Sequence, residues 1–206
     1  EIRTKTNLNN GFGTGDFAVT AVGDMCAAGG YHIDGNTHTI TAGGWDIWHT
    51  FDAFRFVHKK LTGDFDVRLR MVSVENTHEW VKAGLMAREN LSSTARNVAT
   101  LANNNRVMAQ HRSETAGVSF SDIAFNINGP KFVRLVRSGD DFSRFYSLDG
   151  INWTQLGSTL NLSFPNTIFV GMAVTSHNDC VATRAVLDNV DINGGVGTLD
   201  GTFTYG

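Results

Sequence analysis

Hydrophobic and polar residues alternate along much of this chain. From residue 64 to residue 71 every second position is apolar, starting at Phe65 and ending at Met71, and the positions between are Asp or Arg. This period of two is typical of a β-strand with one buried and one solvated face, because successive side chains of a strand point to opposite sides. Similar short runs recur at residues 54–58, 80–88, 106–112, 118–125, 132–137, 142–146, 168–175 and 185–192.

Turn signals separate most of these runs. The clearest is Asp149-Gly150, which lies between two β-rich runs within residues 142–156. Asp-Gly tolerates positive φ at both central positions of a tight turn, so this segment predicts a β-hairpin. No stretch has the 3.6-residue period of an amphipathic helix of three or more turns. We therefore expect an all-β protein, an antiparallel sandwich of two sheets.

Length and composition fit one such sandwich. A chain of 206 residues is about one domain long, and its 22 glycines and two prolines suit many turns and well-paired strands. We expect the sandwich to span residues 17–193. Residues 1–16 and 194–206 are polar or rich in Gly and Thr, which predicts linker or edge segments within a larger multidomain protein, or simple surface termini.

Charge and cysteine content narrow the partners and the compartment. The formal net charge is −3 and no basic run is present, which argues against a nucleic-acid partner. No apolar stretch is long enough to span a bilayer. Cys26 and Cys180 are too far apart for a metal or redox motif. They form either a disulfide between the first and last strands, which suits an oxidising compartment, or two buried free thiols.

Three stretches resemble a known family in their order and spacing. They are residues 44–57, which begin Gly-Trp-Asp-Ile-Trp, residues 80–89, and residues 133–153. Over roughly residues 17–193 the chain resembles the concanavalin A-like, laminin-G-like jelly-roll modules of large secreted bacterial proteins, some of which are labelled "regulation of enolase". The resemblance implies a jelly-roll sandwich in a protein outside the cytoplasm or at the cell surface. It implies little about the ligand, because a fold alone does not give a function.

Aromatic and cationic side chains at alternating positions are the candidate sugar ligands. A flat aromatic ring stacks on the apolar face of a pyranose while polar groups take its hydroxyls. If the strands that carry these residues lie side by side, they form a basic, aromatic-edged surface suited to an acidic glycan. Alternatively, Met86, Met108 and Phe142 mark the same faces as core, and we assign Trp45 and Trp48 to packing. The candidate ligand-binding residues are Trp80, Lys82, Arg88, Gln110, Arg112, Arg144 and Tyr146.

Aspartates offer a second kind of site. Sandwich lectins often hold a structural Ca²⁺, which needs six to eight oxygen ligands. The candidate calcium ligands are Asp46, Asp52, Asp188 and Asp191, with turn and strand-end capping as the alternative for Asp188. The alternating carboxylates of a laminarinase-type glycosidase are missing: Asp64 and Asp66 have no Glu partner.

These features predict a non-catalytic, lectin-like carbohydrate-binding module with a polysaccharide or glycan as its partner. Two other functions remain open. One is a structural or adhesive sandwich that binds protein, and the other is a glycoside hydrolase or lyase with an unfamiliar site.

Overall fold

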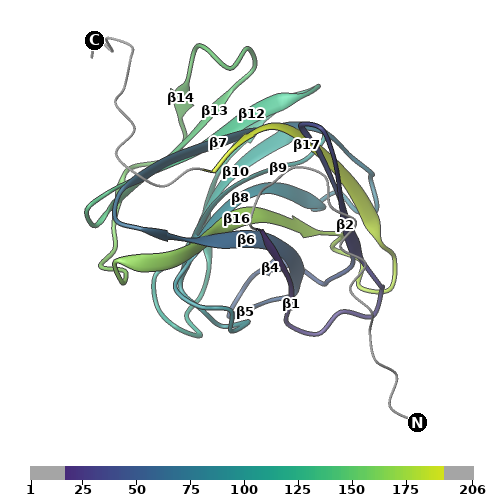
Figure 1. Ribbon diagram of the computed structural model, residues 1–206, viewed down its shortest axis with the longest axis horizontal. Coiled ribbons are helices and arrows are strands. Elements are labelled where there is room, and N and C mark those ends of the chain that lie inside the picture. Colours follow the sequence, from purple (N-terminus) through teal and green to yellow (C-terminus); the bar gives the residue numbers. More distant parts are fainter. Residues whose placement is uncertain (1–16, 193–206) are drawn as a thin grey trace.

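The computed structural model describes residues 17–192, and the segments predicted to be linkers lie outside them. Two large antiparallel sheets pack face to face in the described part of the chain, which contains no α-helix (Figure 1). The prediction of an all-β, two-sheet sandwich is confirmed. No helix among these residues is long and apolar enough to cross a membrane.

Seven strands form the first sheet. Their order across the sheet is β1 (Ala18–Val22), β6 (Phe54–Thr62), β16 (Thr167–Thr175), β8 (Lys82–Arg88), β9 (Asn97–Ala102), β10 (Arg106–Arg112) and β11 (Phe120–Phe125). Neighbours in the sheet are often distant in sequence, because the chain passes repeatedly between the two layers.

The second sheet has eight strands. Its order is β14 (Thr154–Gln155), β13 (Asp141–Ser147), β12 (Lys131–Ser138), β7 (Phe65–Val74), β17 (Thr183–Asp191), β3 (Thr37–Ala42) and β2 (Gly30–Asp34), and β15 (Leu160–Asn161) also pairs with β13. All nine alternating runs found in the sequence overlap strands of these two sheets, although residues 80–81 and 118–119 precede the strands to which their runs belong.

A small hairpin gives the seven-stranded sheet a second core. The main core lies between the two sheets and includes Leu69, Leu85 and Leu135. On the opposite side of the seven-stranded sheet, which we call the outer face, β4 (Ile47–Trp48) and β5 (Phe51–Asp52) pair with each other and lie over the strands (Figure 1). We call this pair the cover hairpin. It buries Ile47 against a second cluster whose other members include Phe54, Phe56, Met86 and Met108.

The predicted hairpin at Asp149-Gly150 exists, but its turn is longer than two residues. Strands β13 and β14 pair Tyr146 with Thr154, so Asp149-Gly150 lies inside an irregular loop. The Asp149 carboxylate organises that loop by accepting hydrogen bonds from Ser147 Oγ and from the backbone amides of Ile151 and Asn152, each at 2.8 Å.

The two cysteines form a disulfide, although not between strands. Cys26 lies in the loop after β1 and Cys180 in the loop before β17. Backbone contacts reinforce this junction, since the Ala27 amide donates to the Asp179 carbonyl at 2.9 Å. The disulfide therefore joins two loops that are 154 residues apart in sequence.

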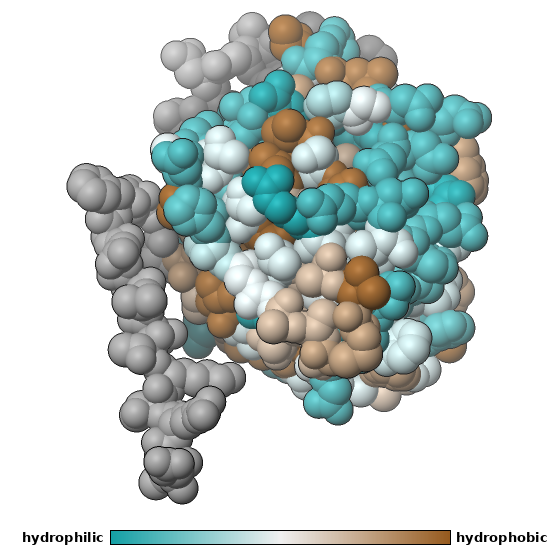
Figure 2. Space-filling model, turned by 90° about the vertical axis from the view of Figure 1, so that its right-hand side faces the viewer, coloured by the Kyte–Doolittle hydropathy of each residue, from teal (hydrophilic) through white to brown (hydrophobic). Residues whose placement is uncertain are grey.

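One face of the sandwich carries both polar and hydrophobic areas. Figure 2 shows this face with hydrophilic residues over much of its upper part and residues of intermediate and hydrophobic character in its lower central part. Large hydrophobic side chains that remain exposed include Trp45, Phe51, Phe120 and Ile151.

Candidate functional site

Strand register sets the side chains of the outer face in rows. Strands β8 and β10 flank β9, so alternate residues of all three strands point to the same side. Two rows matter here: one is formed by Met86, Ala99 and Gln110, and the next by Arg88, Asn97 and Arg112. The sequence had grouped most of these side chains on common faces, and the register brings those faces together.

At one end of the outer face, the cover hairpin closes over a buried ionic cluster. Arg112 donates to both carboxylate oxygens of Asp52, at 2.9 and 2.6 Å, and Arg88 lies 3.4 Å from the same carboxylate. All three side chains are completely buried. We call this set the closed cluster. Because Asp52 belongs to β5, the cluster ties the cover hairpin to the sheet.

Arg112 also holds the part of the cover hairpin that carries Trp48. Its guanidinium donates to the carbonyls of Trp48, at 3.1 Å, and His49, at 3.3 Å. Ser119 Oγ donates to the same His49 carbonyl at 2.8 Å. The turn of the hairpin is therefore fixed from below by side chains of the sheet and of the loop beside it.

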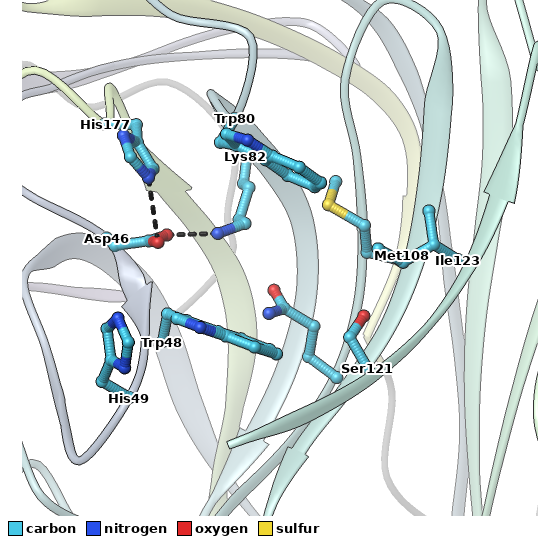
Figure 3. Close-up of a pocket in the computed structure, with 10 residues that line it drawn as sticks. Asp46, Trp48, His49, Trp80, Lys82, Met108, Ser121, Ile123 and His177 are labelled. Atoms are coloured by element: carbon cyan, nitrogen blue, oxygen red, sulfur yellow. Dashed lines mark hydrogen bonds and ion pairs between the residues drawn. The ribbon is translucent and has the colours of Figure 1, made fainter. Parts of the chain in front are cut away.

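At the other end of the outer face, a pocket of about 360 Å³ remains open. Figure 3 shows Trp48 and Trp80 on opposite sides of this space, with polar groups at one end. We call it the open pocket. Its lining residues are Asp46, Trp48, His49, Trp80, Lys82, Met108, Gln110, Ser121, Ile123 and His177.

Three polar side chains form a linked group at one end of the open pocket. Asp46 accepts a hydrogen bond from Lys82 Nζ on one oxygen and from His177 Nε2, at 3.0 Å, on the other (Figure 3). Burial raises the pKa of Asp46, but the contacts with His177 and Lys82 outweigh it and hold that pKa below its usual value. Burial lowers the pKa of the Lys82 ammonium, and the carboxylates of Asp46 and Asp52 oppose this shift.

Neighbouring residues support the two tryptophans. The Arg106 guanidinium lies over the Trp80 ring, 4.2 Å from its centroid, and is itself paired with Glu79 at 3.1 Å. Trp48 is held through its backbone by Arg112. The Trp80 ring and the backbone of Trp48 are therefore held in place beside the pocket, which lowers the entropy lost when something binds between the two rings.

Gln110 and two histidines carry marks of a binding site. Gln110 is 3% exposed, its Nε2 donates to the Ile47 carbonyl at 3.3 Å, and its Oε1 has no hydrogen-bond partner among the described residues. A buried acceptor without a partner is unfavourable unless a ligand or water completes it. His49 and His177 both have positive φ, at 48° and 54°. Such strained backbone often occurs at functional sites.

The structure brings together only part of the predicted binding surface. Trp80, Lys82 and Gln110 all line the open pocket. Arg88 and Arg112 also lie on the outer face, but they belong to the closed cluster and are completely buried. The expectation that these two arginines contact a ligand is therefore wrong. Because Arg112 is fully buried and multiply bonded, replacing it acts first on the fold.

Arg144 and Tyr146 lie on the other sheet. They belong to β13 and share its inward side with the core residue Phe142, so they do not join the outer face. Arg144 is buried and donates to the Ser158 carbonyl at 2.6 Å. The predicted basic surface is thus replaced by a smaller pocket with mixed charge.

Several residues of the open pocket are not among the candidate ligand-binding residues that the sequence indicates. The sequence assigns Trp48 to packing and reads Met108 as a possible core marker, and it gives no role to His49, Ser121, Ile123 and His177. Trp45, also assigned to packing, is 61% exposed. The sequence could not group these residues, because they come together only in the folded chain. His177 lies in the β16–β17 loop and Trp48 lies in the cover hairpin.

The four candidate calcium ligands do not converge. Asp46 is bonded to Lys82 and His177, and Asp52 lies in the closed cluster. Asp188 and Asp191 lie on β17 in the other sheet, where Asp188 accepts from Arg70 Nε at 2.7 Å and Asp191 lies 3.5 Å from Arg68. Each of the four carboxylates is paired with a cationic side chain or with His177, and the four lie on different parts of the two sheets. They therefore do not form a Ca²⁺ site together. Calcium binding elsewhere on the chain stays a prediction.

One other group of potential metal ligands occurs in the described residues. It consists of Cys26, Asp179 and Cys180. Its two sulfurs are bonded to each other and are not thiolates, so the group lacks the ligands of a metal centre.

Sequence comparison identifies no relatives: no family model matches the chain, and no curated protein matches it. Solved structures do match. A functionally unknown protein from Saccharomyces cerevisiae is 12% identical with a TM-score of 0.68, and the match covers 88% of this chain and 97% of that one. The carbohydrate binding module CBM66 from Bacillus subtilis is 16% identical with a TM-score of 0.52, over 84% and 92% of the two chains.

The GH43 BlXynB protein from Bacillus licheniformis also matches, at 14% identity with a TM-score of 0.54. That match covers 74% of this chain but 32% of the other, so this chain corresponds to about a third of the larger protein. At such identities the likeness concerns the fold alone, and no matching family model supports the narrower resemblance to proteins labelled "regulation of enolase". The protein therefore has the jelly-roll sandwich fold that occurs in carbohydrate-binding proteins.

Proposed function

We propose that the protein is a non-catalytic carbohydrate-binding module that binds a neutral sugar residue in the open pocket. The observation that carries this proposal is the position of Trp48 and Trp80 on opposite sides of a 360 Å³ space with hydrogen-bonding groups at one end (Figure 3). Small-molecule pockets are usually about 300–1,000 Å³, mostly apolar, with a few polar groups that fix orientation. A pyranose matches both features, since it has apolar C–H faces and hydroxyls at its rim.

The polar groups have the right chemistry for hydroxyls. The unpartnered Oε1 of Gln110 accepts a hydrogen bond, and the linked Asp46, Lys82 and His177 offer both acceptors and donors. The charges of Asp46 and Lys82 balance, and the arginines once expected at the surface are buried. A neutral sugar therefore fits better than an acidic one, and binding should depend little on salt.

The carboxylate content favours binding over hydrolysis. Most glycosidases use two carboxyl groups on either side of the scissile bond. Among the described residues, Asp46 is the only carboxylate that lines the open pocket. One observation favours a second candidate, a lyase: Lys82 is buried and its pKa is lowered, as in lysines that transfer protons. Incubation with polysaccharides and a search for new reducing or unsaturated ends separates the two functions.

The disulfide supports a place outside the cytoplasm. Disulfides form and persist in secreted and lumenal proteins and are rare where glutathione keeps thiols reduced. The bond between Cys26 and Cys180 is exposed rather than shielded in the core, so its persistence depends on the surrounding compartment. A glycan partner at the cell surface or outside the cell agrees with that location.

A glycan array followed by calorimetry tests the proposal. We expect a Kd of about micromolar to millimolar for a neutral glycan, since one small pocket supplies only several kcal/mol. Trp48→Ala and Trp80→Ala should each weaken binding by about tenfold or more, through loss of stacking and burial. Trp153→Ala is the matched control, because Trp153 lies near Phe132 on the other sheet. Absence of binding across the array would favour a structural module instead.

A further inference from the structure

A second hollow continues the open pocket beyond Trp48. It has a volume of about 330 Å³ and shares Asp46, Trp48, His49 and His177 with the open pocket. Its two additional lining residues are Trp45 and Phe51. We call it the second hollow. The shared residues form the boundary between the two spaces, so a molecule that occupies one of them lies directly beside the other.

Trp45 and Phe51 are exposed on a backbone that is held in place. Trp45 is 61% exposed and Phe51 is 53% exposed. Gly44, before Trp45, has a φ of +104°, and an added Cβ there would lie 2.0 Å from the Ala53 carbonyl oxygen. The Asp46 carbonyl accepts from the Ala53 amide at 2.7 Å. Close packing thus fixes the chain on both sides of Trp45.

Phe51 is placed by the cover hairpin. It is the direct cross-strand partner of Trp48, so the two rings lie on the same side of the hairpin. The next amide, of Asp52, donates to the Ser93 carbonyl at 2.8 Å. Two large aromatic side chains are therefore presented to solvent by rigid backbone beside a polar-ended pocket, which is typical of a stacking platform rather than of loose packing.

We infer that the second hollow is a second sugar subsite, so that the protein binds a glycan chain of two or more units and not a lone terminal monosaccharide. This inference rests on the proposed function of the open pocket. One unit lies between Trp48 and Trp80, and the adjoining unit stacks on Trp45 and Phe51. The His49 and His177 side chains, common to both spaces, face the linkage between the units.

The test compares chain length with single substitutions. Calorimetry is run on glucose, xylose and mannose, and on the di- and tetrasaccharides of each, with the wild-type chain. The expected result is tighter binding of the oligosaccharides. Trp45→Ala and Phe51→Ala should lower the affinity for the tetrasaccharide by about threefold to tenfold and leave the affinity for the monosaccharide unchanged, because neither residue lines the open pocket. Phe120→Ala is the matched control, since Phe120 is 52% exposed on β11.

The outcomes separate the inference from the function on which it rests. If Trp45→Ala and Phe51→Ala bind the tetrasaccharide as tightly as wild type while Trp48→Ala and Trp80→Ala do not, the second subsite is overturned and the open pocket stands. Equal wild-type affinity for monosaccharide and tetrasaccharide also overturns the second subsite. If the wild-type chain binds none of these sugars nor any glycan on the array, the proposed function fails and the inference falls with it.

Discussion

The closed cluster and the open pocket are built from similar groups on the same strands, yet they have opposite characters. Each contains one aspartate from the segment of the cover hairpin and a cation from β8, Arg88 in one case and Lys82 in the other. In the closed cluster every side chain is completely buried. In the open pocket the Asp46 side chain is 19% exposed and faces free space. The difference lies in the cover, because the hairpin lies over one end of the sheet face and only borders the other.

The choice of cation agrees with this difference. An arginine remains charged in nearly any environment, and its planar fork matches a carboxylate, so it suits a permanent buried pair. A lysine releases its proton more readily when its surroundings change. Burial lowers the pKa of Arg88 to about 10, which still leaves it charged at neutral pH. The arginine end thus suits a permanent buried ion pair, and the lysine end suits the sugar binding that we propose for the open pocket.

The largest expected effect comes from removing the two aspartates in turn. Asp52→Asn leaves two buried guanidiniums without a counter-charge, so the free energy of unfolding should fall by about 3–5 kcal/mol. Asp46→Asn should lower it by only about 1–2 kcal/mol, because Lys82 can lose its proton and stay buried as a neutral amine. Urea denaturation of both variants measures the difference. Equal losses of stability in the two variants would show that the closed cluster needs its aspartate no more than the open pocket does.

The disulfide gives the next largest effect. The Cys26→Ser and Cys180→Ser double variant should lose about 2–5 kcal/mol of unfolding free energy, because the bond closes a very long loop. His177 lies in the loop that the bond anchors, so the sugar binding proposed for the open pocket should also weaken, while the closed cluster stays intact. Denaturation of the oxidised and reduced protein and mass spectrometry of free thiols check this. Two free thiols in protein from an oxidising compartment would contradict the bond.

Alternation predicted the sheets well but missed strands that lack it. Strand β9, Asn-Val-Ala-Thr-Leu-Ala, is buried at all six positions because it lies in the middle of a sheet that is covered on both sides. Such a strand has no solvated face and hence no period of two. The β2–β3 hairpin was also overlooked, although Asp34 pairs with Thr37 around a Gly35 with a φ of 55°. That turn had a readable signal, the Gly35-Asn36 dipeptide at its centre.

The site was only partly predictable for a related reason. Alternation identified the face that carries Lys82 and Gln110, because both lie on regular strands. It could not show that β4 and β5, each of two residues, fold over part of that face and bury Arg88 and Arg112. Nor could it place Arg144 on the opposite sheet. Sequence periodicity reports which side of a strand a residue takes, whereas exposure depends on what lies above that side.

The smallest expected effect is a pH dependence of stability that arises from His58, which lies close to the closed cluster. His58 lies on the outer face, where its ring stacks on Phe56 with centroids 4.7 Å apart. Burial lowers the pKa of His58, and the positive charge of Arg88 lowers it further. The unfolded chain then binds a proton near pH 6.5 that the folded chain does not, so stability is complete above pH 6.5 and falls as the pH drops towards the lower folded pKa.

Denaturation at a series of pH values between 7 and 5 measures this effect against variants. His58→Gln keeps a side chain that can hydrogen-bond Thr20 Oγ1, which lies 2.9 Å from the imidazole in the wild type, but it cannot take up the proton. The slope of stability against pH should therefore decrease in this variant, although burial also lowers the pKa of His38 and His111 and leaves part of the slope in place. His32→Gln, at an exposed position on β2, is the matched control. An unchanged slope in His58→Gln would mean that the charges of the closed cluster do not oppose protonation of His58. The contrast with the open pocket would then rest on burial alone.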